Sequence, residues 1–438
     1  MVLKLFANRI ESDKLGLEDP CETIVVEVEH SIDSKGLAGP PPDGGWGWVV
    51  VFATFLILFV CFGLNNTWGV YQEFYMRNNP EFGLFHISLI GGLNNGLTFL
   101  GGPLAGPLIT RFGYRVPMLI GTFLLPISLC LASFTTQVWH LYLSQGILFP
   151  VAASMLFLPA MPLPSQWFLK RRALATSICS SGSGIGGLLL APIIRYLISQ
   201  YSVEWCLRIV AGISFVFCLL ATMLARPRIA ASARKCGNKA FDLSLFRQNS
   251  GFCSLVAYAF INNFGYLIPF IYIPSYATHI GLQAETGAML LGLLSGINAV
   301  GRIFSGYLAD IIGSINVQLA FVLLSGLSCI LVWLFANSFV LLLIFVILFG
   351  LLGGAYWAVM PSTAADIVGV EYLGSALNLI YLSNVVPLAF GTMVASSLLE
   401  KSGSYTPPIL FAGLTLIAGS ALLVHTRLWK SKRIFARV

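Results

Sequence analysis

Long apolar stretches follow one another along nearly the whole chain after residue 45, and short polar connections separate them. Each stretch has about twenty residues or more, enough for a helix to cross a hydrocarbon core of about 30 Å. Lipid offers no hydrogen-bond partners to a backbone, so we predict that each stretch is a membrane-spanning helix. Twelve helices are expected, at residues 46–72, 85–109, 116–134, 139–163, 173–197, 205–225, 250–274, 286–309, 315–335, 339–362, 374–398 and 407–427.

The composition agrees with this pattern. Hydrophobic residues make up 57% of the chain and charged residues only 10%, whereas about a quarter of the residues in soluble domains are charged. The expected fold class is therefore an all-α polytopic membrane protein. Because the apolar stretches fill nearly all of the chain, an enzyme held by a single membrane anchor is excluded.

Motifs for catalysis and metal binding are missing from the sequence. It contains five histidines and nine cysteines but no HExxH, no GxSxG and no CxxC pair. Residues 182–187 match the glycine pattern of a dinucleotide site, but no strand precedes them, and small residues at this spacing allow membrane helices to pack closely. We expect no enzyme activity, no catalytic residue, no cofactor and no metal.

Basic residues in the short connections account for the net charge of +7. Such residues accumulate in cytosolic loops, so the pattern indicates orientation in a lipid bilayer and not nucleic-acid binding. It predicts that both termini are cytosolic, in the plasma membrane or, as the alternative, the vacuolar membrane. The basic residues of the predicted inward connections are Arg111, Arg115, Lys170, Arg171, Arg172, Arg226, Arg228, Arg234, Lys235, Lys239, Arg247, Arg427, Lys430, Lys432, Arg433 and Arg437.

The order of polar and apolar segments predicts five regions. Residues 1–45 are rich in acids and lack a long apolar stretch, which indicates a disordered cytosolic tail. Six helices at 46–225 and six at 250–427 form two bundles, joined by a cytosolic loop at 226–249. A short basic tail, 428–438, follows the last helix.

Two glycine-containing segments of the halves repeat one another. The first follows the second predicted helix, the other follows the eighth, and their glycines are offset by 200 residues. Two copies at corresponding places predict a duplicated transporter fold, in which glycine permits tight turns and close approach between helices. The key positions are Gly106, Arg111 and Gly113 in the first copy, and Gly306, Asp310 and Gly313 in the second.

These paired turns resemble the loop signature of the major facilitator superfamily. The lead-in to the first helix, Asp43, Gly44, Gly45 and Trp46, is similar to that of the monocarboxylate transporter family. A second stretch, 167–187, resembles the fungal-type branch of that family. The resemblance covers residues 40–428 and implies two six-helix bundles that transport a small solute by alternating access.

Two of these motifs have both a structural and a functional interpretation. Trp46 suits an anchor at the membrane surface, and Gly44 and Gly45 let the chain turn from tail into helix. The resemblance also suggests that this lead-in takes part in opening and closing. The cluster Lys170, Arg171 and Arg172 either holds its loop in the cytosol or also forms an inner gate.

Arg302 is the most informative single residue because it lies inside the eighth predicted helix. A cation at that depth is costly unless it is paired or solvated. Its side chain could reach toward the inner surface, which is the purely structural alternative. The functional interpretation is that the guanidinium binds an anionic group of the transported solute. The resemblance supports the second, since the family has a substrate-linked arginine in this helix.

Two positions depart from the family pattern. Proton-coupled carriers of the family have an aspartate one turn before that arginine and a lysine in the first helix, whereas here the residues are Asn298 and Asn66. An amide cannot take up or release a proton. Whether protons are partners is therefore left open.

Other polar and aromatic residues within helices are candidate lining of the substrate path. Together with many aromatics, one buried cation suits a small, partly apolar organic anion. The alternatives are an efflux transporter that exports a fungal secondary metabolite and, from another class, a solute sensor that does not transport. Solute identity, direction of transport and any accessory subunit are not encoded visibly. Besides Arg302, the candidate binding residues are Asn66, Asn263, Tyr266, Asn298, Trp357 and Asn378.

Overall fold

The computed structural model describes residues 43–78, 84–228 and 242–431, and every regular element in these ranges is helical. Most of the predicted tail 1–45, much of the loop 226–249 and the end of the tail 428–438 lie outside the described residues. The elements of the N-terminal half are α3 (Trp46–Asn66), α4 (Trp68–Asn78), α5 (Leu84–Leu100), α6 (Gly102–Phe112), α7 (Arg115–Ala132), α8 (Val138–Leu141), η2 (Tyr142–Leu148), α9 (Phe149–Ala160), α10 (Pro164–Trp167), α11 (Arg172–Gln200) and α12 (Val203–Leu224).

The C-terminal half has a matching series of helices. Its elements are α13 (Ser244–Gln248), α14 (Ser250–Tyr266), α15 (Ile268–His279), α16 (Ala284–Ile312), α17 (Ser314–Leu331), η4 (Trp333–Phe335), α18 (Phe339–Gly353), α19 (Ala355–Val368), α20 (Leu373–Ser383), α21 (Val385–Ser402) and α22 (Thr406–Lys430).

Eleven helical runs in the described ranges are long and apolar enough to cross a membrane. The predicted span 85–109 is the one that differs, because it forms two consecutive helices, α5 and α6, that meet at Gly101. A Cβ at Gly101 would lie 2.0 Å from the Ser154 hydroxyl, so the backbone there passes close against α9. Because of this break, neither α5 nor α6 alone is long enough to cross a membrane, although α6 directly follows α5 along the chain.

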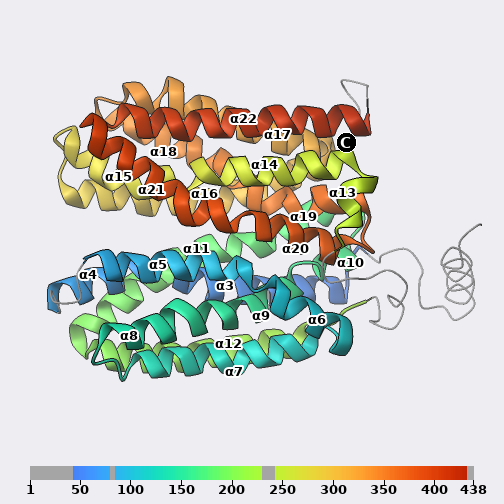
Figure 1. Cartoon of the computed structure of the whole chain (residues 1–438), viewed down its shortest axis with the longest axis horizontal. Coiled ribbons are helices and arrows are strands. Elements are labelled where there is room, and N and C mark those ends of the chain that lie inside the picture. Colours follow the sequence, from blue (N-terminus) through green and yellow to red (C-terminus); the bar gives the residue numbers. More distant parts are fainter. Residues whose placement is uncertain (1–42, 79–83, 229–241, 432–438) are drawn as a thin grey trace, which may run out of the picture.

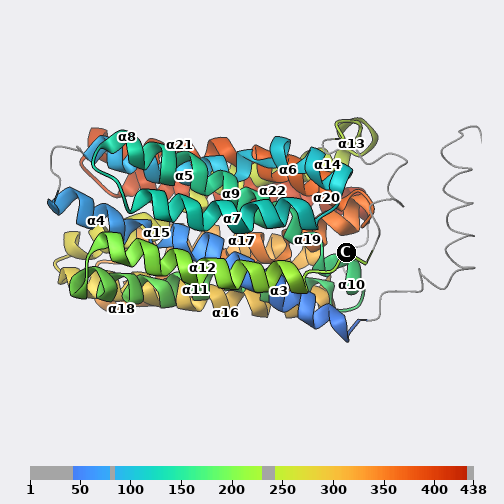
Figure 2. The same ribbon diagram turned by 90° about the horizontal axis from the view of Figure 1, so that it is seen from below.

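The two halves lie side by side with their helices roughly along the long axis of the molecule (Figure 1). The view from below shows the same alignment (Figure 2). Helices α6, α10, α13 and α20 lie at one end, and α4, α8, α15 and α18 lie at the other. We call the first the charged end, since it carries Asp43, Arg172, Asp310 and Asp366, and the second the far end.

The first helix of each half is interrupted at an equivalent position. Helix α3 gives way to α4 at Thr67, and α14 gives way to α15 at Leu267, which is 200 residues later. The Thr67 hydroxyl donates to the carbonyl of Leu64 at 2.7 Å and so competes with the helical backbone. In the second half Pro269, near the start of α15, has no N–H for the ladder. Corresponding interruptions in two halves indicate a substrate site between them.

The glycines of residues 182–187 pack helices closely, as the sequence analysis expected. A Cβ at Gly182 would lie 2.5 Å from the carbonyl oxygen of Phe55, and one at Gly186 would lie 2.4 Å from that of Phe59. Helices α11 and α3 therefore touch through their backbones. Since the glycines lie within α11 and face another helix, they form no nucleotide loop.

Candidate substrate site and gate

The lead-in to α3 is bonded to the loop that precedes α11. The carboxylate of Asp43 accepts hydrogen bonds from the backbone N–H of Leu169 at 2.7 Å and of Lys170 at 2.8 Å. The expected turn from tail into helix is made at Gly45, with φ 56°, and at Asp43, with φ 49°, whereas Gly44 has no positive φ. Arg226 lies over the ring of Trp46 at 4.4 Å. The lead-in thus holds the start of α3 against the loop 168–171.

Both glycine turns of the internal repeat have the expected backbone. Gly113 ends α6 with φ 79°, and Gly313 ends α16 with φ 108°. A side chain would be strained at either angle, so the repeated glycines are required by the turns. Arg111 is exposed and lies over the Phe112 ring at 5.2 Å.

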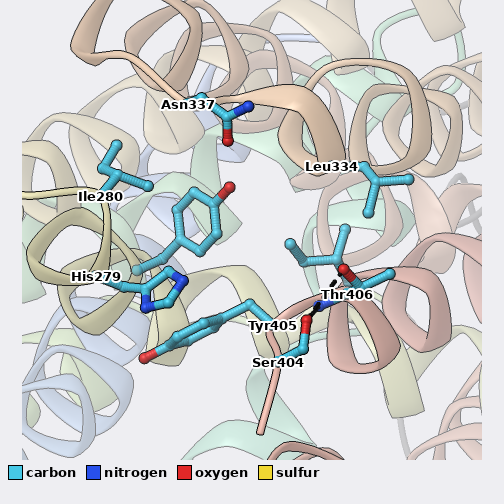
Figure 3. Close-up of a pocket in the computed structure, with 9 residues that line it drawn as sticks. His279, Ile280, Leu334, Asn337, Ser404, Tyr405 and Thr406 are labelled. Carbon is cyan, nitrogen blue, oxygen red and sulfur yellow. Dashed lines mark hydrogen bonds between the residues drawn. The ribbon is translucent and has the colours of Figure 1, made fainter. Parts of the chain in front are cut away.

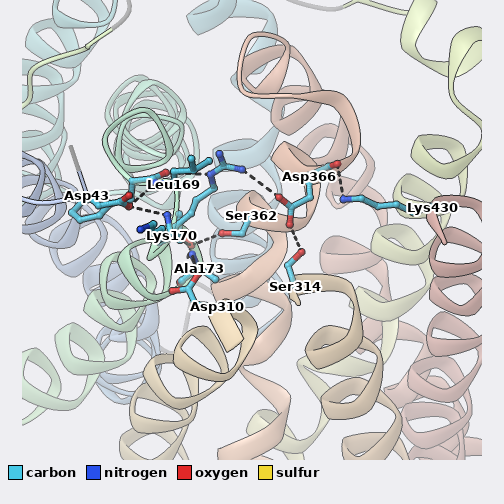
Figure 4. A network of polar contacts seen from close by, with 12 residues as sticks. Asp43, Leu169, Lys170, Ala173, Asp310, Ser314, Ser362, Asp366 and Lys430 are labelled. Atoms are coloured by element: carbon cyan, nitrogen blue, oxygen red, sulfur yellow. Dashed lines mark hydrogen bonds and ion pairs between the residues drawn. The ribbon is translucent and has the colours of Figure 1, made fainter. Parts of the chain in front are cut away.

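At the charged end, Asp310 joins the two halves. It lies on α16 of the C-terminal half, and its two carboxylate oxygens accept from the backbone N–H of Ala173 and of Leu174, each at 2.9 Å (Figure 4). These N–H groups belong to the first turn of α11, where a negative charge is favoured by the helix dipole. Asp310 therefore caps a helix of the opposite half.

An ion pair and a hydroxyl pair support the same junction. Arg172 pairs with Asp366 of α19 at 3.3 Å, and Asp366 also accepts from the hydroxyl of Ser314 at 2.5 Å (Figure 4). One turn farther along α11, the hydroxyls of Thr176 and Ser362 lie 3.1 Å apart. In this structure the charged end is closed by contacts between the halves.

Arg302 lies farther from the end of its helix than the predicted span 286–309 implies. Helix α16 continues to Ile312, so Arg302 is ten residues from its end, or about 15 Å at 1.5 Å per residue. Only 8% of the residue is exposed. Its Nε donates to Asn298, which lies one turn earlier in α16 and is therefore farther from the charged end than Arg302. The purely structural alternative, in which the side chain reaches toward the surface at the charged end, is therefore wrong in this structure.

The guanidinium of Arg302 is surrounded by neutral oxygen atoms. Nε donates to Asn298 Oδ1 at 3.0 Å, and one terminal nitrogen donates to Tyr266 Oη at 3.3 Å. The other terminal nitrogen donates to the Ser180 carbonyl at 2.7 Å and to the Ser183 hydroxyl. Both serines lie on α11, so the cation bridges the two halves.

The predicted binding residues fall into two groups. Asn298 and Tyr266 bond Arg302 directly, and Asn66 donates to the carbonyl of Ser183 at 3.2 Å. Asn66 and Tyr266 each lie next to the interruption of the first helix in their half. The two interrupted helices therefore approach the same buried cation from opposite halves.

The remaining predicted residues do not bond the guanidinium. Trp357 packs against Tyr266, with ring centroids 6.3 Å apart. Asn263 donates to Asn384 at 3.1 Å in a buried polar network of the C-terminal half. Asn378 is buried on α20. A binding role for these three stays a prediction.

Aromatic rings from both halves meet close to this cluster. Phe99 of α5 lies 5.4 Å from Trp357, and Phe157 of α9 lies 5.0 Å from Tyr381, measured between ring centroids. These rings provide an apolar wall beside the cation. Phe99, Phe157 and Tyr381 were not anticipated, since an aromatic residue in an apolar run shows no sign of which helix it will face.

A sizeable cavity lies elsewhere. It has a volume of about 350 Å³ at the far end and is lined by residues such as His279, Asn337 and Tyr405 (Figure 3). All of its lining residues belong to the C-terminal half. A site that alternates between two sides must be shared by both halves, so this cavity is not the transport site.

The sequence matches the Major Facilitator Superfamily over residues 53–330 and 298–433, two overlapping segments that cover most of the chain. The chain belongs to the major facilitator superfamily. It is therefore a membrane transporter and not an enzyme, and the predicted fold class is confirmed.

Relatives of this transporter also confirm the resemblance to fungal and monocarboxylate carriers. A protein named "MFS-type transporter" from Gibberella moniliformis is 31% identical over 91% of this chain and 94% of its own length. "Monocarboxylate transporter 12" from Homo sapiens is 28% identical over 90% of this chain and 83% of its own. This chain is thus similar both to fungal transporters of the superfamily and to monocarboxylate transporters.

Solved structures of the superfamily share the fold of this transporter. The human organic anion transporter MFSD10 (TETRAN) aligns with a TM-score of 0.69 and 15% identity, over 88% of this chain and all of that one. The superfamily transporter FucP in the outward conformation aligns with a TM-score of 0.68 and 16% identity, over 86% of this chain and 98% of that one. At these identities the likeness concerns the fold alone.

Proposed function

We propose that this transporter moves a small monocarboxylate-like organic anion by alternating access, with the carboxylate bound by Arg302. The observation that carries the proposal is a buried guanidinium, between the two halves, whose bonded partners are all neutral. Anions are the natural partners of such a group, because charge-assisted hydrogen bonds from arginine to carboxylate are strong and can be bidentate. The aromatic wall suits a partly apolar anion.

Support for an anionic solute also comes from the names of similar proteins. Monocarboxylate transporters are among the relatives by sequence, and an organic anion transporter shares the fold. The alternative is export of a fungal secondary metabolite, and fungal transporters are among the relatives too, such as the "MFS transporter asaE" from Aspergillus flavus, 29% identical over 92% of this chain. Metabolite profiles of a deletion strain would distinguish the two.

The basic residues at the charged end support an orientation of the transporter in the membrane. The exposed cations Lys170 and Arg171 lie there beside the Arg172 pair, and basic loops face the cytosol. We propose that the charged end is cytosolic, that both chain termini lie on that side, and that the transporter resides in the plasma membrane. The structure then corresponds to a state closed toward the cytosol.

Flux measurements in reconstituted vesicles test the anion site. The probes are labelled L-lactate, pyruvate and phenylpyruvate, with protein-free vesicles as the background. Truncation of one partner of a buried charge pair costs about 2–5 kcal/mol, so Arg302→Ala should lower the apparent affinity for the transported anion at least about 30-fold. Arg302→Lys should restore flux only in part, because an ammonium lacks the planar fork.

A matched control is available in another arginine of a membrane helix. Arg208 of α12 donates to Ser133 and lies over the rings of Phe134 and Trp205, all in the N-terminal half. Arg208→Ala should leave the affinity for the anion unchanged. Equal flux in the wild type and in Arg302→Ala would refute the anion site.

A further inference from the structure

The bonds that Arg302 makes across the two halves have a consequence for how the carrier can move. One terminal nitrogen of the guanidinium donates to the carbonyl of Ser180 and to the hydroxyl of Ser183. Both acceptors lie on α11, in the stretch Arg172–Ser183 that also bonds Asp310 and Ser362 at the charged end. Opening of the charged end must draw this stretch away from α16.

The charge of Arg302 is not balanced within the bonds it makes. Its other two partners, Asn298 and Tyr266, are neutral as well. Of the acids on α16 and α19, Asp310 caps α11 and Asp366 pairs with Arg172, both at the charged end, whereas Glu285 is exposed at the opposite end of α16. An empty carrier that separates α11 from α16 would leave a buried cation without two of its four acceptors, which is costly.

A bound carboxylate removes this obstacle. Its two oxygens can accept the hydrogen bonds that Ser180 and Ser183 otherwise accept, and its charge balances the guanidinium. The loaded carrier then has no bond from Arg302 to the opposite half that must break. The guanidinium of Arg302 donates to four acceptors, two of which lie on α11. A solute that enters between the halves would displace these two.

We infer that the transporter is an anion exchanger, in which Ser180 and Ser183 hold the empty carrier through Arg302 and the bound carboxylate releases it. The inference rests on the proposed function. It assigns a positioning role to Ser183, which acts through Arg302. It also assigns a role to Asn298, whose neutral amide leaves the cation dependent on the solute for its counter-charge.

Exchange and net flux in reconstituted vesicles test this inference. Vesicles are loaded with labelled L-lactate, pyruvate or phenylpyruvate, and potassium with valinomycin clamps the voltage so that charge build-up does not limit net flux. Efflux is compared with and without the same unlabelled anion outside. Two charge-assisted hydrogen bonds correspond to about a 100-fold difference in rate, so exchange should exceed net efflux by about that factor.

Two variants separate this mechanism from a general effect on folding. Ser183→Ala removes one acceptor and should raise net efflux relative to exchange, whereas Ser181→Ala, whose hydroxyl donates only to Ile178 on the same helix, should not. Asn298→Asp places a carboxylate beside the Nε of Arg302 and should bring net efflux close to exchange.

Each result of the flux experiment decides something. Exchange well above net efflux, with the ratio lowered in Ser183→Ala and Asn298→Asp, supports the inference. Equal rates of exchange and net efflux in the wild type overturn it and leave the proposed function intact. No carrier-dependent flux of any of the three probes would overturn both.

Discussion

Gly306 should decide whether the charged end can close. It lies on α16 where that helix crosses the first turns of α11. A Cβ at this position would lie 2.3 Å from the Cβ of Ser177 and 2.7 Å from the carbonyl oxygen of Ala173. Rotation of Ser177 cannot relieve this overlap, because its Cβ and the backbone oxygen are both fixed. The change Gly306→Ala should therefore force the halves apart.

The size of the effect follows from the overlap. Ordinary contacts of a Cβ begin at 3.4 Å, so the helices must separate by about 1 Å. Overpacking of this kind costs about 1–3 kcal/mol, which shifts the equilibrium between closed and open charged ends by about 5- to 150-fold. A closed end that predominates in the wild type should open measurably in the variant.

Distances between spin labels measure this shift without a known solute. Labels at Arg115 of the N-terminal half and Glu371 of the C-terminal half, both exposed at the charged end, report its opening. The nine native cysteines are first replaced. Gly292→Ala is the matched control, because Gly292 also lies on α16 and a Cβ there would meet nothing within 4 Å.

The expected result is a longer distance between labels in Gly306→Ala than in the wild type and in Gly292→Ala. Identical distance distributions in all three proteins would refute the argument. A change of the same size in both glycine variants would show that any added methyl group on α16 disturbs the helix, and it would count equally against a specific role for Gly306.

Two further predictions concern the same junction. Asp310→Ala removes both hydrogen bonds to the first turn of α11 and should lengthen the same label distance. Asp310→Asn keeps one acceptor and should lengthen it less. Equal distances in the two variants would contradict the capping role. Arg172→Asp should open the charged end because it breaks the pair with Asp366. The second change Asp366→Arg should restore about 0.2–1 kcal/mol of the closing free energy, as expected for a partly exposed pair. Absence of any rescue in the double variant would show that the ion pair does not contribute to closing.

The membrane architecture could be predicted without any structure. Runs of apolar residues determine where helices cross the bilayer, because each helix is exposed to lipid separately and must be apolar along its own sequence. The repeat of Gly113 as Gly313 is local in the same way, since each of these turns has a backbone angle that requires a glycine. Arg302 was visible for a related reason, as a charge inside an apolar run is conspicuous on its own.

The contacts between the halves were decided only by the tertiary structure. No spacing along the chain indicates that Asp310 caps a helix more than a hundred residues earlier, or that Ser180 and Ser183 accept bonds from Arg302. Small polar residues on a membrane helix are as suited to helix packing as to a binding site. Which of these they serve depends on the helix they face, and that is determined by how the two bundles come together and not by any local property of the sequence.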